Sequence, residues 1–315
     1  MLSHTYSSPF PRSSGSALIK GAGGDGLIIM SSRRHPWWLR QRGLEPSVLF
    51  SMKKLVEHLS LHTVCESAQC PNQARCFSQG TATFLILGDI CTRNCSFCAI
   101  KKGQPFSPDT DEPRNVALAA NQLELKHVVV TSVTRDDLPN GGAIHFAKTV
   151  DAIRQINPNT TVEVLVPDFQ GSVEALQTIT NSVPEVINHN VETVPRLYSE
   201  VRPQADYHRS LNLLRTVKLL NHSIITKSGL MLGLGEKDYE VVTVMEELRA
   251  AECDCVTLGQ YLPPSPKHYH LARYLTPPEF EEYHTLAREM GFSSVRSGPF
   301  TRSSYDALEI CREVH

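Results

Sequence analysis

The sequence predicts an α/β protein in which parallel strands alternate with helices, and two observations support this fold class. Apolar or β-branched runs of strand length recur from about residue 80 onward, and stretches with helical periodicity lie between them. The six predicted strands are 82–88, 127–133, 161–167, 185–191, 223–232 and 253–260. Because parallel strands need right-handed crossover connections, these units form either a barrel or an open curved sheet.

The stretches between the strands show the spacing of half-buried helices. The clearest apolar stripe lies in 143–157, at Ile144, Ala147, Val150, Ile153 and Ile156. Thr276 and Glu279 form a capping-box pattern, with Pro277 in the first turn, that starts a helix over 277–290. The other predicted helices span 114–124, 172–181, 206–221 and 238–250. In such folds chemistry gathers at the carboxyl ends of the strands, so functional residues are expected just after each strand.

Composition and charge narrow the classes of function. The 315 residues include 31 Lys and Arg and 33 Asp and Glu, a formal net charge of −2, which offers no bulk attraction to nucleic acid or anionic lipid. No apolar run approaches the ~18 residues that a transmembrane helix needs. The nine cysteines are too few for a disulfide-built scaffold. Their tight clustering fits metal ligation in a reducing compartment.

The first cysteine group directly follows the first predicted strand. Cys91, Cys95 and Cys98 have the spacing C-x3-C-x2-C, and the residues between them are mostly polar. Packing of three thiols on one helical face is the first alternative, and a zinc site is the second, although structural zinc usually takes four ligands. Three thiolates are better suited to a four-iron, four-sulfur cluster that leaves one iron open to a chelating ligand.

A second group precedes the first strand. Cys65, Cys70 and Cys76 have the spacing C-x4-C-x5-C. Disulfides among three thiols would leave one unpaired, so a second iron–sulfur cluster is the better interpretation. One iron again lacks a thiolate, and substrate, water or an oxygen ligand would complete it.

The pattern around the first group resembles the signature of the radical S-adenosylmethionine (SAM) superfamily. The resemblance includes the aromatic Phe97 before the last cysteine. It implies that SAM chelates the open iron through its amino and carboxylate groups, and that an electron from the cluster cleaves SAM to give a 5′-deoxyadenosyl radical. It also implies a partial TIM-type (β/α)6 barrel with N- and C-terminal extensions over the barrel mouth.

Both cysteine groups, in this order and followed by Arg302-Ser303-Ser304-Tyr305, resemble the lipoyl synthase family. The similarity extends from about residue 35 and includes 135–143, 188–193, 233–236 and 260–265. In that family a serine of the C-terminal motif ligates an auxiliary cluster, which here would be held by Cys65, Cys70 and Cys76. The resemblance assigns this role to Ser304, with Ser303 as the alternative.

The resemblance also divides the chain into four segments. Residues 1–34 are Ser-rich and acid-poor, and they are interpreted as a disordered tail, as a transit peptide, or as the product of a start upstream of Met30. An N-terminal extension with the auxiliary cysteines spans 35–80, the radical SAM barrel spans 81–292, and a C-terminal segment spans 293–315.

The resemblance implies a sulfurtransferase that inserts two sulfur atoms, at C6 and C8, into an octanoyl chain on a lysine of a carrier. Two insertions need two SAM molecules per product, and the auxiliary [4Fe-4S] cluster would supply the sulfur. The implied partners are octanoylated lipoyl carrier domains or the glycine cleavage H protein, and an electron donor such as flavodoxin or ferredoxin. A cytoplasmic monomer is expected, or an organellar one if the first 34 residues are a transit peptide. The alternatives are a biotin synthase-like enzyme and a non-catalytic metal-binding module.

Further residues after the strands have weaker assignments. The predicted contacts of SAM are Phe97, Asn188, Asn190 and Glu192. The last three could equally form a hydrogen-bonded network at the barrel rim. Arg135 and Asp136 are predicted to bind the substrate amide, or to form a salt-linked loop. Lys227 and Lys267 are either contacts of an acidic carrier or solvated surface residues. The other three cysteines, Cys253, Cys255 and Cys311, are interpreted as structural.

Overall fold

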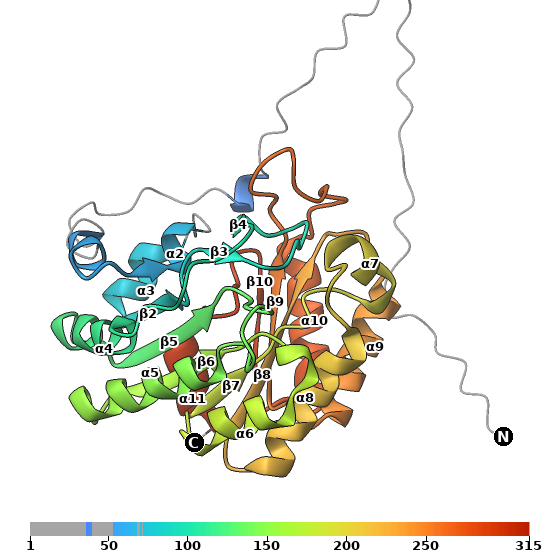
Figure 1. Ribbon diagram of the computed structural model, residues 1–315. Coiled ribbons are helices and arrows are strands. Elements are labelled where there is room, and N and C mark those ends of the chain that lie inside the picture. The colour runs from blue at the N-terminus through green and yellow to red at the C-terminus, as the bar shows by residue number, and fades with distance from the viewer. Residues whose placement is uncertain (1–35, 40–52, 68–69, 71, 315) are drawn as a thin grey trace, which may run out of the picture.

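The computed structural model describes residues 36–39, 53–67, 70 and 72–314, which form one mostly parallel sheet with helices packed along it (Figure 1). The sheet order is β1-β2-β5-β6-β7-β8-β9-β10. Only β1 is antiparallel to its neighbour, and every later pair is parallel. The strands are β1 His62–Thr63, β2 Thr81–Ile86, β5 His127–Ser132, β6 Thr161–Leu165, β7 Val186–Asn188, β8 Ile225–Leu232, β9 Cys255–Gln260 and β10 Ser294–Gly298.

The six predicted helices are present. They are α4 Glu112–Gln122, α5 Ala143–Ile156, α6 Val173–Asn181, α8 Tyr207–Leu220, α9 Asp238–Ala250 and α10 Pro277–Glu289. The start of α10 is as predicted, because the Glu279 carboxylate accepts hydrogen bonds from the backbone N–H and the hydroxyl of Thr276. The shorter elements are η1 Trp37–Leu39, α2 Val64–Ser67, α3 Gln73–Ser78, β3 Ile90–Cys91, β4 Lys101–Lys102, η2 Phe169–Gly171, η3 Pro195–Leu197, α7 Tyr198–Val201 and α11 Ala307–Val314. The predicted tail at 1–34 lies outside the described residues.

Two sequence-based expectations are corrected. The sheet contains a seventh parallel strand, β10, which pairs with β9; it escaped prediction because Val295 is its single hydrophobic residue. Ile144 is 49% exposed and does not belong to the buried face of α5. Phe146, Val150 and Ile153 form that face, because their four- and three-residue spacings follow the helical period and a strict three-residue spacing drifts from it.

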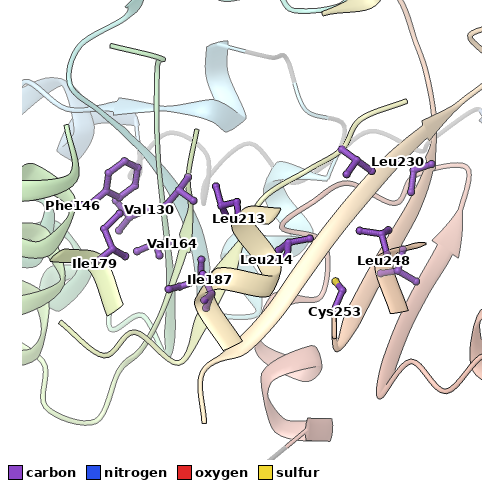
Figure 2. Packing of buried hydrophobic residues seen from close by; sticks show 14 of the residues in the cluster. Val130, Phe146, Val164, Ile179, Ile187, Leu213, Leu214, Leu230, Leu248 and Cys253 are labelled. Carbon is purple, nitrogen blue, oxygen red and sulfur yellow. The ribbon is translucent and has the colours of Figure 1, made fainter. Parts of the chain in front are cut away.

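The outward faces of the strands form the main hydrophobic core. Figure 2 shows Val130, Val164 and Ile187 of three neighbouring strands in one packed layer with Phe146 of α5 and Ile179 of α6. All five side chains are fully buried. Burial of such side chains against a sheet is the largest stabilising contribution in this class of fold.

A second, smaller core closes one end of the sheet's inner face. Ile310 and Cys311 of α11 pack against Val186, Ile225 and Cys255. These three residues begin β7, β8 and β9, respectively. The helix α11 therefore covers the amino-terminal ends of these strands and leaves their carboxyl ends as the open end. Burial of the cysteines in this region agrees with their interpretation as structural.

Among the described residues, no helix combines the length and the apolar composition needed to cross a bilayer.

Candidate functional site

The first cysteine triad lies in a loop at the carboxyl end of β2. Cys91 ends the short strand β3, and Cys95 and Cys98 follow it in the loop. Neighbouring segments fix the backbone: the N–H of Thr92 donates to Thr134 at 3.1 Å, and the N–H of Ser96 donates to Val201 at 3.0 Å. The loop is thus attached to the segment after β5 and to the end of α7, and it does not depend on a cluster alone for its shape.

Arg93, inside this loop, anchors it to two further strand ends. Its guanidinium donates to the carboxylate of Asp136 after β5, at 2.7 and 2.9 Å, and to that of Asp168 after β6, at 2.6 and 3.0 Å. Burial opposes ionisation of Asp168, but the hydrogen bonds and charge of Arg93 outweigh it and hold the pKa of Asp168 below its ordinary value. Two bidentate contacts of this kind fix the orientation of the Arg93 side chain and stabilise the loop.

The thiols of the first triad lie close enough to influence one another. Burial, followed by the charges of Cys95 and Cys91, raises the pKa of Cys98 to about 11. Burial also raises the pKa of Cys95, and the cation of Arg202 opposes this effect. Thiols in such surroundings stay protonated until a metal displaces the proton.

The second triad belongs to the N-terminal extension beside β2. Cys65 lies in α2, Cys76 lies in α3, and the N–H of Cys70 donates to the carbonyl of Cys65 at 3.0 Å. Burial and then the neighbouring Cys70 raise the pKa of Cys65 to about 12. Burial and the same neighbour raise the pKa of Cys76 to about 11. These three thiols therefore form a separate group.

The C-terminal motif lies against this second triad. Arg75 of α3 forms an ion pair with Asp306 at 3.3 Å and lies 4.9 Å from the ring centre of Tyr305. Burial raises the pKa of Cys70, and the charge of Arg302 opposes this increase. The two ends of the described chain thus meet at one place, as the predicted extensions require.

The structure distinguishes the two serines of the motif. The hydroxyl of Ser303 donates to Oδ1 of Asn190 at 2.9 Å and accepts from Nδ2 of Asn188 at 3.0 Å. The hydroxyl of Ser304 makes no hydrogen bond to a described residue. Ser304 is thus the serine of the motif whose oxygen is available to an additional ligand or metal.

Polar side chains lead from the C-terminal motif toward the first triad. Asn190, which accepts from Ser303, donates to Glu192 at 3.1 Å. Besides burial, the charge of Glu192 raises the pKa of Cys95 and of Cys98. The C-terminal motif and the first triad therefore lie at the same end of the barrel, where β7 finishes.

Glu192 is held in a conformation that its residue type seldom adopts. Its φ is +64°, and its backbone bonds to Gly229 and Met231 of β8 at 2.9 Å each. Positive φ at a residue other than glycine persists only where the surroundings enforce it, and such positions cluster at functional sites.

Arg202 is a site residue that the sequence patterns missed. Its Nη1 donates to the carbonyls of Asn190 and Val191 at 2.9 and 3.1 Å, and its buried Nε has no partner among the described residues. Its charge lowers the pKa of Cys95 against the effect of burial. Arg202 follows the short helix α7 and not a strand, so a search at strand ends could not find it.

The remaining predicted site residues have internal partners. Arg135 is 2% exposed; it bonds to both oxygens of Asp137 at 2.8 Å and to the carbonyl of Leu87 at 3.2 Å. This geometry agrees with a salt-linked loop, as does the pairing of Asp136 with Arg93. Phe97 packs against the main core from the cysteine loop. Roles of these residues toward SAM or substrate stay predictions.

Both alternatives predicted for Lys227, a contact with an acidic carrier and a solvated surface position, are wrong. Its side chain is 0% exposed, and its Nζ lies 3.0 Å from both carboxylate oxygens of Glu163. Strand alternation directs both side chains to the inner face of the sheet, away from the helices. Lys267, in contrast, is exposed.

The donor sets differ from those of a site for a single ion. Within the described residues, no three His, Cys, Asp or Glu side chains converge closely enough to hold one metal ion. The corners of a four-iron cluster accept thiolates that are more widely separated, and three soft sulfur donors in each triad match iron–sulfur chemistry. Both triads fit such a cluster by donor type and by grouping.

Comparison with known proteins decides the family. The sequence model of the radical SAM superfamily matches residues 85–248. The lipoyl synthase of Caldanaerobacter subterraneus subsp. tengcongensis is 57% identical over 274 residues, which cover 87% of this chain and 96% of that protein. The lipoyl synthase of Alkaliphilus metalliredigens is 53% identical over 280 residues, covering 89% and 97%. The chain belongs to the lipoyl synthase family. The predicted family and function are confirmed, and the chain is a radical SAM enzyme that inserts sulfur.

Solved structures support the fold. Methylornithine synthase (PylB) matches with a TM-score of 0.51 at 12% identity, covering 78% of this chain and 81% of that one. Streptococcus suis SuiB bound to S-adenosylmethionine matches with a TM-score of 0.51 at 11% identity, covering 79% and 60%. The predicted barrel-like α/β fold is confirmed.

Proposed function

We propose that this chain inserts two sulfur atoms, at C6 and C8, into an N6-octanoyl-lysine of a carrier protein, and that its two triads hold two [4Fe-4S] clusters with different tasks. The observation that carries this proposal is the link between the triads. Arg75, the neighbour of Cys76, contacts the C-terminal motif through Tyr305 and the adjoining Asp306. Ser303 of that motif reaches Glu192 beside the first triad through Asn190.

When bound, the two clusters would supply the chemistry that side chains lack, which is electron transfer to SAM at the first triad and a source of sulfur at the second. No acid or base of a protein removes a proton from an unactivated alkyl carbon. Removal of each hydrogen atom would instead depend on SAM bound at the first triad, with two SAM molecules per product. The protein has to hold the reactants in line and exclude water.

Residues around the first triad fit the charged end of SAM. Its methionine part carries a carboxylate and an ammonium group. Arg202 offers a buried cation whose Nε has no partner among the described residues, Glu192 offers a carboxylate, and both act electrostatically on Cys95. We assign the SAM carboxylate to Arg202 and the ammonium group to Glu192. Asn190 and Phe97 would border the same site, and Asn188 would support it from beneath.

Residues around the second triad fit a cluster that is consumed. Three thiolates leave one iron without a cysteine, and Ser304 carries the available hydroxyl. A serine oxygen is a hard ligand and poorly matched to iron in a thiolate setting. Such a bond would be the first to break when the cluster opens.

The proposed partners are the octanoylated lipoyl carrier domain, or the glycine cleavage H protein, and a flavodoxin or ferredoxin as electron donor. Lys267 is exposed on the segment that follows β9, and it is the lysine that we assign to an acidic carrier. We place the chain in the cytoplasm, because reduced clustered thiols require a reducing compartment. We further propose that it is a monomer.

Anaerobic turnover of matched variants tests the division of tasks. Full-length protein should hold about eight iron atoms, four for each cluster. It should convert an octanoyl-lysine peptide to the lipoyl form, which mass spectrometry detects. Cys95→Ala should abolish SAM cleavage and product. Cys70→Ala should retain SAM cleavage and form no product. Product from Cys70→Ala would overturn the assignment of the second triad.

A further inference from the structure

Ser303 is seated between two asparagines at the end of β7. Its hydroxyl accepts from Asn188 at 3.0 Å and donates to Asn190 at 2.9 Å. These residues are more than a hundred positions from it in sequence. The contact therefore ties the C-terminal segment to the barrel and uses both the donor and the acceptor of the hydroxyl.

The asparagine beneath Ser303 rests on a buried charged pair. Nδ2 of Asn188 also donates to Glu163 at 2.8 Å, and Nζ of Lys227 lies 3.0 Å from both oxygens of that carboxylate. Nε2 of His127 lies 3.7 Å from the same carboxylate. All four side chains are 0% exposed. Oδ1 of Asn188 is buried without a partner among the described residues. A buried amide oxygen without a partner destabilises a fold, so selection for stability alone would not favour asparagine at this position.

The backbone of the C-terminal segment also fits closely on the sheet. A Cβ atom at Gly259 of β9 would lie 2.1 Å from the carbonyl oxygen of Thr301. A Cβ atom at Gly229 of β8 would lie 2.9 Å from Oδ1 of Asn190. Only glycine permits both approaches, so two strands accommodate the segment and the asparagine that holds it.

We propose that Ser303 and Asn188 are positioning residues, which latch the C-terminal segment onto the barrel and thereby direct Ser304 toward the second cysteine triad. Ser304 is the next residue in the chain, so fixing the Ser303 side chain inward restricts where the Ser304 hydroxyl can point. The buried pair of Glu163 and Lys227 holds Asn188 in register for this contact. The proposal rests on the proposed function for the identity of the group that Ser304 binds.

The first test measures release of iron from the second triad alone. The full chain carries Cys91→Ala, Cys95→Ala and Cys98→Ala, is reconstituted anaerobically, and is mixed with an iron chelator. Ser303→Ala should release iron at least ten times faster than this parent, and Ser303→Thr should restore the slow rate because it keeps a hydroxyl. An unchanged rate for Ser303→Ala would overturn the proposal.

Ser297→Ala is the matched control. It removes a hydroxyl of the same C-terminal segment, but that hydroxyl donates to the carbonyl of Phe280 in α10 at 2.7 Å and not to the asparagines. Release from Ser297→Ala should stay within twofold of the parent. An acceleration equal to that of Ser303→Ala would show a general loosening of the segment and overturn a specific latch.

A second measurement needs no cluster. Hydrogen exchange of residues 299–306 in the cluster-free chain should be at least ten times faster in Ser303→Ala and unchanged in Ser304→Ala. Equal exchange in Ser303→Ala and wild type would overturn the latch. If wild-type protein forms no lipoyl product while Ser303→Ala still accelerates both exchange and iron release, the proposed function fails and the latch stands.

Discussion

Removal of one partner from the ion pair inside the barrel should be costly. Lys227→Met keeps much of the side-chain volume but leaves Glu163, which is 0% exposed, without its cation. Breaking a buried pair by removing one partner costs about 3–5 kcal/mol, because the remaining charge is uncompensated. We expect this loss in the free energy of unfolding at pH 7, measured by urea denaturation of the cluster-free chain.

The pH dependence gives this prediction a distinctive sign. In the wild type, burial opposes ionisation of Glu163, but Lys227 outweighs it and lowers the pKa to about 2. A lowered pKa contributes stability that is present above the unfolded pKa of about 4.5 and is lost as pH falls toward 2. In Lys227→Met, burial raises the pKa of Glu163 relative to the wild type, because the largest opposing influence is gone and only those of His127 and Asn188 remain. The deficit of the variant should therefore shrink between pH 8 and pH 5.

Two further variants control this experiment. Arg312→Met removes an exposed partner of Glu309, and such pairs contribute at most about 1 kcal/mol. Adding Glu163→Gln to Lys227→Met removes the orphaned charge and should recover part of the loss. A deficit below about 1 kcal/mol for Lys227→Met, or one that does not change with pH, would refute the description of the pair as buried and coupled.

Three other predictions concern the site. Arg93→Met should lower the iron content of the first triad by about half or more, since two carboxylates lose their anchor; full iron occupancy would contradict this. Arg202→Met should weaken SAM binding at least tenfold, about 1.4 kcal/mol, in equilibrium dialysis with both clusters intact; unchanged affinity would exclude Arg202 from the SAM site. Gly259→Ala should displace Thr301 and reduce the iron content of the second triad. It should also lower the free energy of unfolding by about 1–3 kcal/mol through overpacking. Wild-type stability and iron content in this variant would contradict the close fit of the segment.

The two cysteine triads could be recognised from sequence as candidate cluster ligands because their spacing is local. Three thiols at short spacing lie close together whatever the rest of the chain does. The fold determines only where the group lies in the molecule. The second triad and the C-terminal motif are brought together by contacts between segments far apart in the chain, such as Arg75 with Asp306. No spacing in the sequence encodes such a contact, so only the resemblance connected the C-terminal motif with Cys65, Cys70 and Cys76.

Residues whose roles depend on tertiary contacts were harder to predict. A lysine in a strand is usually solvated, but Lys227 faces inward because Glu163 lies opposite it on the same inner face. The strand β10 has too few apolar residues to be seen alone and is stabilised by pairing with β9. Arg202 reaches the site from a turn after α7. In each case the position of the residue or strand depends on a tertiary contact and not on its own sequence pattern.

The most direct test of the two-cluster account is an isotope experiment. The chain is reconstituted with heavy-isotope sulfide, freed of excess sulfide, and given SAM, reductant and an octanoyl-lysine peptide under anaerobic conditions. Mass spectrometry should show a lipoyl product in which both inserted sulfur atoms are heavy, at no more than about one product per chain. Product carrying sulfur of natural isotope abundance would contradict the account.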